Sequence, residues 1–173
     1  MLVTQQQKLR DFVTALAEEH GRDRSALLPI LQRVQRRYLY ISEYAMQVVA
    51  DLLDIHPVEV HSVVTFYRFL DTEPKGEFVI RLCQTISCMM KGTGRLARQI
   101  ENDLGIAFGE TTPDGKFTLE WANCLGMCDR GPAMLVNDDV YTELTPEKVH
   151  EIIEDCRQSF AASSRQTQED KHQ

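Results

Sequence analysis

The chain has 173 residues, of which 43% are hydrophobic and 26% are charged. That length allows one ordinary domain or two small ones, and the composition is that of a globular protein with a packed core. Both observations exclude a large multidomain enzyme and a globally disordered chain. The longest stretch without Asp, Glu, Lys or Arg covers residues 82–90, which is too short to cross a bilayer.

The net charge of −7 is concentrated in the middle of the chain. Residues 76–156 hold 7 basic and 14 acidic residues, whereas residues 1–75 hold 9 and 10. Binding to phosphate groups requires clustered Lys and Arg, so we expect no nucleic-acid partner. The first residues lack the basic start and long apolar run of a secretory signal. We therefore expect a cytoplasmic protein without membrane insertion, either free or on the cytoplasmic face of a membrane complex.

Four stretches with helical periodicity fill the first 75 residues. Apolar residues recur at the i, i+3, i+4 and i+7 spacing between residues 5 and 20, and Gly21 follows as a stop signal. Three further helices are expected to start at the polar N-caps Ser25 and Ser42 and at the first-turn residue Pro57. Short connections between these helices predict a small helical bundle.

The pattern changes in the turn-forming segment 71–76, where we place a domain boundary. Beyond it the sequence predicts a strand at 78–82 that runs into Cys83, a helix at 92–104, a strand at 116–122, a hairpin of 133–136 and 140–142 around 137–139, and a helix capped by Thr145. The predicted fold class is therefore α+β, with a helical bundle domain at 1–75 and an α/β domain at 76–160. Residues 161–173 are polar and lack periodicity, which predicts a disordered tail.

All five cysteines lie in the acidic middle segment. Cys83 and Cys88 form a C-x4-C pair, and Cys124 and Cys128 form a C-x3-C pair. A reducing compartment disfavours structural disulfides, so the pairs are interpreted first as metal or cluster ligands. Four thiolates can bind one Zn²⁺ or can share the two irons of a [2Fe–2S] cluster, two per iron. Structural zinc pairs most often have a two-residue gap, so the wider gaps favour the cluster without settling the choice.

The remaining candidates are expected to have structural roles. These are packing for Cys156, surface or capping positions for His56 and His61, and shielding of the cysteines from water for Met89, Met90 and Met127. The sequence has no pair of catalytic carboxylates, no Ser–His–Asp set and no nucleotide-binding fingerprint. We therefore expect the chain to be non-catalytic on its own.

The cysteine motifs resemble those of a known family. The strings that carry the resemblance are Cys83-Gln-Thr-Ile-Ser-Cys88 with Lys91-Gly92, Asn123-Cys124-Leu-Gly-Met-Cys128-Asp-Arg-Gly-Pro132, and Thr145-Pro-Glu-Lys148. They resemble the small [2Fe–2S] subunit of respiratory NADH dehydrogenase (complex I), over about residues 20–158. The same family includes diaphorase subunits of NAD(P)-linked hydrogenases and formate dehydrogenases. The Gln-Thr-Ile-Ser insert departs from many relatives, which have smaller residues there, and this bears on the reduction potential.

The resemblance implies a thioredoxin-like ferredoxin domain behind the helical bundle, with one [2Fe–2S] cluster held by Cys83, Cys88, Cys124 and Cys128. It also implies a larger partner subunit that carries FMN, the NAD(P)H site and a further iron–sulfur cluster. The expected function is transfer of single electrons between the cluster and that flavin. One alternative is a zinc-stabilised interaction module without a redox role. Another is a thiol–disulfide oxidoreductase, which the absence of a C-x-x-C spacing disfavours.

Overall fold

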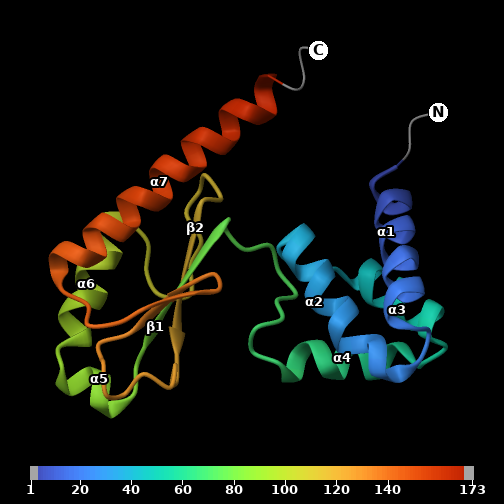
Figure 1. Ribbon diagram of the computed structural model, residues 1–173, viewed down its shortest axis with the longest axis horizontal. Helices are drawn as coiled ribbons and strands as arrows, with labels where there is room; N and C mark the ends of the chain where they lie inside the picture. The colour runs from blue at the N-terminus through green and yellow to red at the C-terminus, as the bar shows by residue number, and fades with distance from the viewer. Residues whose placement is uncertain (1–3, 170–173) are drawn as a thin grey trace. The chain divides into compact units, whose positions relative to one another are not determined.

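The structure, a computed structural model, describes residues 4–169 and divides the chain into two compact units, 1–75 and 76–173. Figure 1 draws both units, and each has a hydrophobic core of its own. The division falls in the segment where the sequence pattern changes. Within the described residues, no helix combines the length and the apolar character that a membrane crossing requires.

The first unit is a bundle of helices whose apolar faces meet in one core. Its elements are α1 (Gln5–His20), the 3-10 turn η1 (Arg24–Ala26), α2 (Leu27–Tyr38), α3 (Glu43–Leu53) and α4 (Pro57–Phe66). Ile30 and Leu31 of α2 and Val49 of α3 are fully buried there. The Ser42 hydroxyl accepts a hydrogen bond from the Ala45 N–H at 3.2 Å, so α3 begins at the N-cap that the sequence predicts.

The second unit is built on a mixed four-stranded sheet. Its elements are β1 (Phe78–Cys83), α5 (Ile86–Met90), α6 (Thr93–Leu104), β2 (Phe117–Ala122), β3 (Met134–Val136), β4 (Asp139–Tyr141) and α7 (Pro146–Glu169). The strand order is β2-β1-β3-β4. β1 and β2 run parallel, whereas β3 is antiparallel to both β1 and β4. The connection between the two parallel strands contains α5 and α6.

Helices α6 and α7 cover one face of this sheet (Figure 1). Ile80 and Leu82 project from β1 into the core on that face, where Ile100 of α6 and Ile153 of α7 meet them. Alternate residues of β1 face the other way, because side chains on a strand alternate between its two sides. The architecture confirms the predicted α+β class, with a helical bundle followed by an α/β unit.

Two local predictions are wrong. Ser25 is not the N-cap of α2, because Asp23 accepts the Ser25 N–H at 2.7 Å and the 3-10 turn η1 precedes the helix. The predicted hairpin turn at 137–139 is one residue too long, because Asp139 pairs with Val136 as the first residue of β4. Asn137 occupies the turn with φ 52°, a region that Asn adopts more readily than most residues.

The C-terminal helix α7 extends to Glu169. The segment 161–173, for which composition predicts disorder, therefore falls partly on this helix. Its last four residues, 170–173, lie outside the described residues. The disordered tail stays a prediction.

Candidate functional site

The four paired cysteines lie at one end of the parallel strand pair. Cys83 is the last residue of β1 and pairs in register with Ala122, the last residue of β2. Parallel strands share their direction, so the segments that follow them leave from the same edge of the sheet. Cys88 lies in the segment after β1, and Cys124 and Cys128 lie in the loop after β2. The fold thereby places the cysteines that the sequence singles out at the same end of the sheet, and the charges of Cys88 and Cys83 contribute to raising the pKa of Cys128.

These cysteines form an inner pair and an outer pair. The inner pair, Cys83 and Cys88, is buried, with 2% and 1% of the residue exposed, and packs against Ala133. The outer pair, Cys124 and Cys128, is exposed, and its two sulfur atoms lie 3.9 Å apart. One side of the site is thus sealed into the protein, and the other side is open to an approaching molecule.

The thiols influence one another's protonation. Burial raises the pKa of Cys83, but hydrogen bonds led by those from Thr85 outweigh it and hold this pKa below its ordinary value. Burial, followed by the hydrogen bond with Cys83, raises the pKa of Cys88. The hydrogen bond and charge of Cys124 raise the pKa of Cys128. Thiolates this close repel one another, and a bound metal cation relieves that repulsion, so the donor set fits a cationic centre.

Backbone amides of the second cysteine loop are directed at sulfur atoms. The Gly126 N–H donates to Cys124 Sγ at 3.4 Å, and the backbone of Leu125 is among the influences that lower the pKa of Cys83. Gly126 adopts φ 78°, a conformation that glycine reaches without steric cost. Amide donors of this kind stabilise anionic sulfur and are one of the means by which a protein sets a cluster potential.

The backbone of residues 131–133 encloses the inner pair. The Cys83 N–H donates to the Ala133 carbonyl at 3.0 Å. A Cβ atom at Gly131 would lie 2.9 Å from Cys88 Sγ, closer than such contacts occur. On the other side, the Thr93 hydroxyl donates to the Cys88 carbonyl at 2.8 Å. The position of the Cys88 sulfur is therefore fixed by close packing that leaves no room for a side chain at 131.

The donor set consists of thiols alone. In the described part of the chain, no group of three or more His, Cys, Asp or Glu side chains is arranged so that it could hold a metal ion. Four thiolates suit the irons of a [2Fe–2S] cluster and also a zinc ion. The chemistry of the side chains therefore fits the expected cluster, and the choice between iron and zinc depends on the family to which the chain belongs.

The methionines near the cysteines differ in their surroundings. Met127 packs against the inner pair, as the sequence predicts. Met89 and Met90 are 46% and 84% exposed, so the prediction that they shield the cysteines is wrong for these two. Ile86, at the start of the same short helix, is 77% exposed.

Cys156 and the two histidines have the structural roles that the sequence predicts. Cys156 lies on the buried face of α7 with 8% of the residue exposed, and burial raises the pKa of its thiol, which disfavours the thiolate needed for ligation. His56 caps α4, because its Nδ1 atom accepts the Val58 N–H at 3.2 Å. His61 lies on the exposed side of the same helix.

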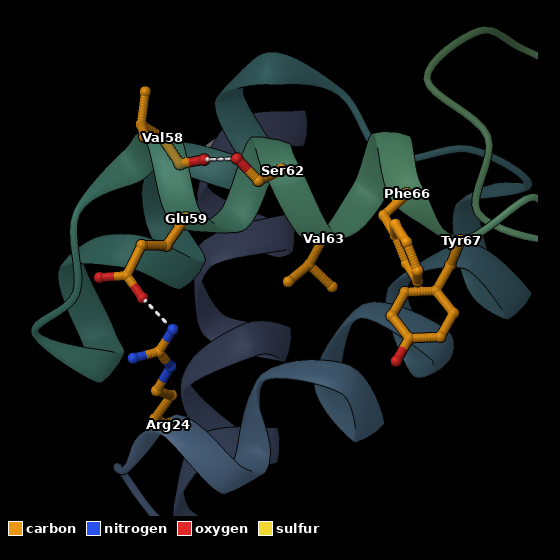
Figure 2. A pocket seen from close by; sticks show the side chains of 7 residues that line it. All are labelled: Arg24, Val58, Glu59, Ser62, Val63, Phe66 and Tyr67. Atoms are coloured by element: carbon orange, nitrogen blue, oxygen red, sulfur yellow. Dashed lines mark hydrogen bonds and ion pairs between the residues drawn. The ribbon is translucent and has the colours of Figure 1, made fainter.

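The helical unit has an open hollow of about 520 Å³ along α4. Figure 2 shows the Arg24–Glu59 ion pair at one end, with a separation of 2.8 Å, and the rings of Phe66 and Tyr67 at the other. Val63 projects into the hollow between them. Phe66 is 79% exposed, so this surface is apolar and accessible. None of the residues that line the hollow is a cysteine.

Comparisons with known proteins agree on one family. The family model described as thioredoxin-like [2Fe-2S] ferredoxin matches residues 13–157. A subunit of the NADH-quinone oxidoreductase of Rhizobium meliloti (strain 1021) is 37% identical over 159 residues, which cover 92% of this chain and 92% of that protein. The corresponding NADH-quinone oxidoreductase subunit of Aquifex aeolicus (strain VF5) is 40% identical over 130 residues, covering 75% of this chain and 81% of that protein.

A solved structure has the same fold. It is the crystal structure of an NAD+-reducing [NiFe]-hydrogenase in the air-oxidised state, which matches with a TM-score of 0.69 at 22% sequence identity. The match covers 82% of this chain and 24% of the hydrogenase chain. At that level of identity the likeness concerns the fold alone.

Proposed function

Because the chain belongs to the thioredoxin-like [2Fe–2S] ferredoxin family, we propose that it is an electron-transfer subunit of a larger NAD(P)H-oxidising complex. One [2Fe–2S] cluster in this chain exchanges single electrons with the FMN of a partner flavoprotein subunit. The observation that carries the proposal is the convergence of two cysteine pairs, from loops after adjacent parallel strands, at a site with one buried and one open side.

The inner pair and the outer pair are the proposed ligands. A [2Fe–2S] cluster takes two thiolates per iron, and the short distance between Cys124 Sγ and Cys128 Sγ supports one pair for each iron. When bound, the cluster supplies a carrier for one electron. The protein's own part is to hold the thiolates, to direct amide hydrogen bonds at sulfur and to exclude water from the inner side.

The partner is proposed from the relatives' roles. The relatives are subunits named for NADH-quinone oxidoreductase, which favours a complex of that kind over a hydrogenase or a formate dehydrogenase as the parent assembly. The exposed outer pair leaves the site accessible to a redox partner. Helix α4 has exposed apolar side chains, of which Phe66 is the most exposed. They support the proposal that the helical unit forms part of the surface that docks against the partner. We keep the cytoplasmic location as part of this proposal.

The experiment that tests this function is metal analysis of the anaerobically purified chain, combined with EPR before and after dithionite. We expect two irons and two acid-labile sulfides per chain, no signal when oxidised and one S = 1/2 signal when reduced. One zinc, no sulfide and no signal would replace the electron carrier by a zinc-stabilised interaction module. In that case removal of zinc should unfold the second unit.

Gly131→Ala should impair the site, because the added methyl group would press on Cys88 Sγ at 2.9 Å. Relief requires the sulfur or the 131–133 backbone to move, which typically costs about 1–3 kcal/mol. We expect a fold that persists with a reduced iron content after aerobic purification. The matched control is Gly94→Ala, where the new Cβ would meet Met89 at an ordinary 3.9 Å. Equal iron content in the two variants would contradict the close packing around Cys88.

A further inference from the structure

Two side-chain bridges join the segments that carry the cysteines. The Gln84 side-chain amide donates to Asn123 Oδ1 at 2.8 Å. The Lys91 ammonium donates to the Asp129 backbone carbonyl, also at 2.8 Å. Gln84 and Asn123 are each next to the first cysteine of a pair, whereas Asp129 follows Cys128 directly and Lys91 is the third residue after Cys88. The segments after β1 and β2, which are far apart in sequence, are thus joined by hydrogen bonds at both ends of the site.

The Lys91 bridge combines a fixed position with a charge. The backbone N–H of Lys91 donates to the Cys88 carbonyl at 3.0 Å, which ties the start of its side chain to the inner pair. Its Cδ atom would lie 3.6 Å from a Cβ at Gly131, so the aliphatic stem runs close to the loop of the outer pair. The ammonium then contacts the carbonyl of the residue after Cys128. A carbonyl has no net charge, so this contact positions the positive charge without neutralising it.

We propose that Lys91 is a positioning residue that clasps the outer-pair loop to α5 and places a cation beside the cluster, which raises the reduction potential. The inference rests on the proposed function. Two ferric ions, two sulfides and four thiolates sum to a net negative charge, and reduction by one electron makes it more negative. A nearby cation stabilises the reduced form more than the oxidised form, so its removal should make the potential more negative.

The two bridges allow the clasp and the charge to be separated. Lys91→Met removes the bridge and the charge together. Lys91→Arg keeps the charge and retains donors that reach a carbonyl. Gln84→Leu removes the neutral bridge at the other end and leaves the charge in place. We expect iron loss to a chelator to be about tenfold faster in Lys91→Met, as for other residues that orient metal ligands. Gln84→Leu should also lose iron faster, whereas Lys91→Arg should resemble the wild type.

The reduction potential distinguishes an electrostatic role from a purely structural one. In EPR-monitored redox titrations of the full chain, Lys91→Met should have a more negative potential than the wild type, and Lys91→Arg and Gln84→Leu should have the wild-type potential. The difference for Lys91→Met should shrink as salt is added, because exposed charges are screened. A wild-type potential in Lys91→Met would overturn the proposal.

A readout without the cluster separates this proposal from the proposed function. In the metal-free full chain, amide hydrogen exchange over residues 126–131 should be faster in Lys91→Met than in the wild type, because the clasp is a contact of the protein with itself. Unchanged exchange would overturn the clasp even if the chain binds a cluster. A wild-type chain with zinc and no sulfide would instead refute the proposed function, and faster exchange in Lys91→Met would still support the clasp.

Discussion

Cys124→Ser is expected to abolish the [2Fe–2S] centre or to change its spectrum while both units of the chain stay folded. Cys124 is exposed, so replacing its sulfur by oxygen removes little buried contact. The proposed ligand set then keeps three thiolates and loses the sulfur that accepts the Gly126 N–H. Loss of iron to a chelator should be at least about tenfold faster than in the wild type. Tenfold is the lower end of the effect of mutating residues that only hydrogen-bond to metal ligands, and replacing a ligand is a larger change.

The matched control for Cys124→Ser is Cys156→Ala. Cys156 is a cysteine of the same unit but lies on the buried face of α7, in a different core cluster from Cys83 and Cys88. Its replacement should leave iron, sulfide and the EPR signal unchanged, with only a small loss of stability from the missing sulfur. Far-UV circular dichroism checks that the helices persist in both variants. An unchanged spectrum and iron content in Cys124→Ser would refute the proposed ligand set.

Local patterns in the sequence predict most helices because their causes are local. The helix expected at 5–20 is observed as Gln5–His20, since a long apolar period and a following Gly21 mark both its body and its end. Helix α5 was missed as an element because Ile86–Met90 is too short to show a period. Its side chains also give no clear apolar face, since Ile86 and Met90 are both largely exposed.

The local sequence pattern is not sufficient to predict how the strands of the sheet pair. Alternation along β1 predicts that Arg81 faces away from Ile80, and it does so. The sequence does not reveal that Arg81 is buried, because burial on that face depends on which strands become neighbours. The partner of Arg81 in the register is Glu120, on a strand 39 residues later. Pairing at that distance follows from topology, which a single sequence does not state.

Some residues of the site can be predicted from the sequence, and others can be recognised only in the fold. The cysteines stood out because thiols in pairs have few structural uses in a reducing compartment. Gly131 and Lys91 belong to the strings that carry the family resemblance, but neither residue type indicates a role by itself, since glycine and lysine are common in loops and on surfaces. Their importance arises from contacts across the fold, such as the 2.8 Å bond from Lys91 to the Asp129 carbonyl. The ligand role of the cysteines stays a prediction until the iron is measured.

Glu120→Ala is expected to lower the free energy of unfolding of the second unit by about 3–5 kcal/mol, the usual cost of removing one partner of a buried ion pair. Arg81 Nε donates to Glu120 Oε2 at 3.0 Å, and the two side chains are only 8% and 4% exposed. Removal of the carboxylate leaves the Arg81 guanidinium in the same buried place without this counter-charge. Because the positive charge stays in a buried place, the cost falls on the folded state.

The measurement uses the single tryptophan of the chain. Trp121 lies in β2 and stacks on Phe108 with a centroid separation of 3.8 Å, so its fluorescence reports unfolding of the second unit and not of the helical bundle. Urea titrations at equal iron content should show the lower free energy of unfolding of Glu120→Ala. The exposed Glu151→Ala on α7 should stay within about 0.5 kcal/mol of the wild type.

A double variant separates the cost of removing one member of the pair from the net contribution of the pair. Arg81→Met with Glu120→Leu replaces both charges by apolar side chains of similar size. The free-energy cost of removing two charges from water offsets most of the attraction between them. We therefore expect this variant to be as stable as the wild type or more stable. If Glu120→Ala costs less than about 1 kcal/mol, water reaches the Arg81 guanidinium and the face is not sealed. If the double variant is as unstable as the single one, the pair itself stabilises the register between β1 and β2.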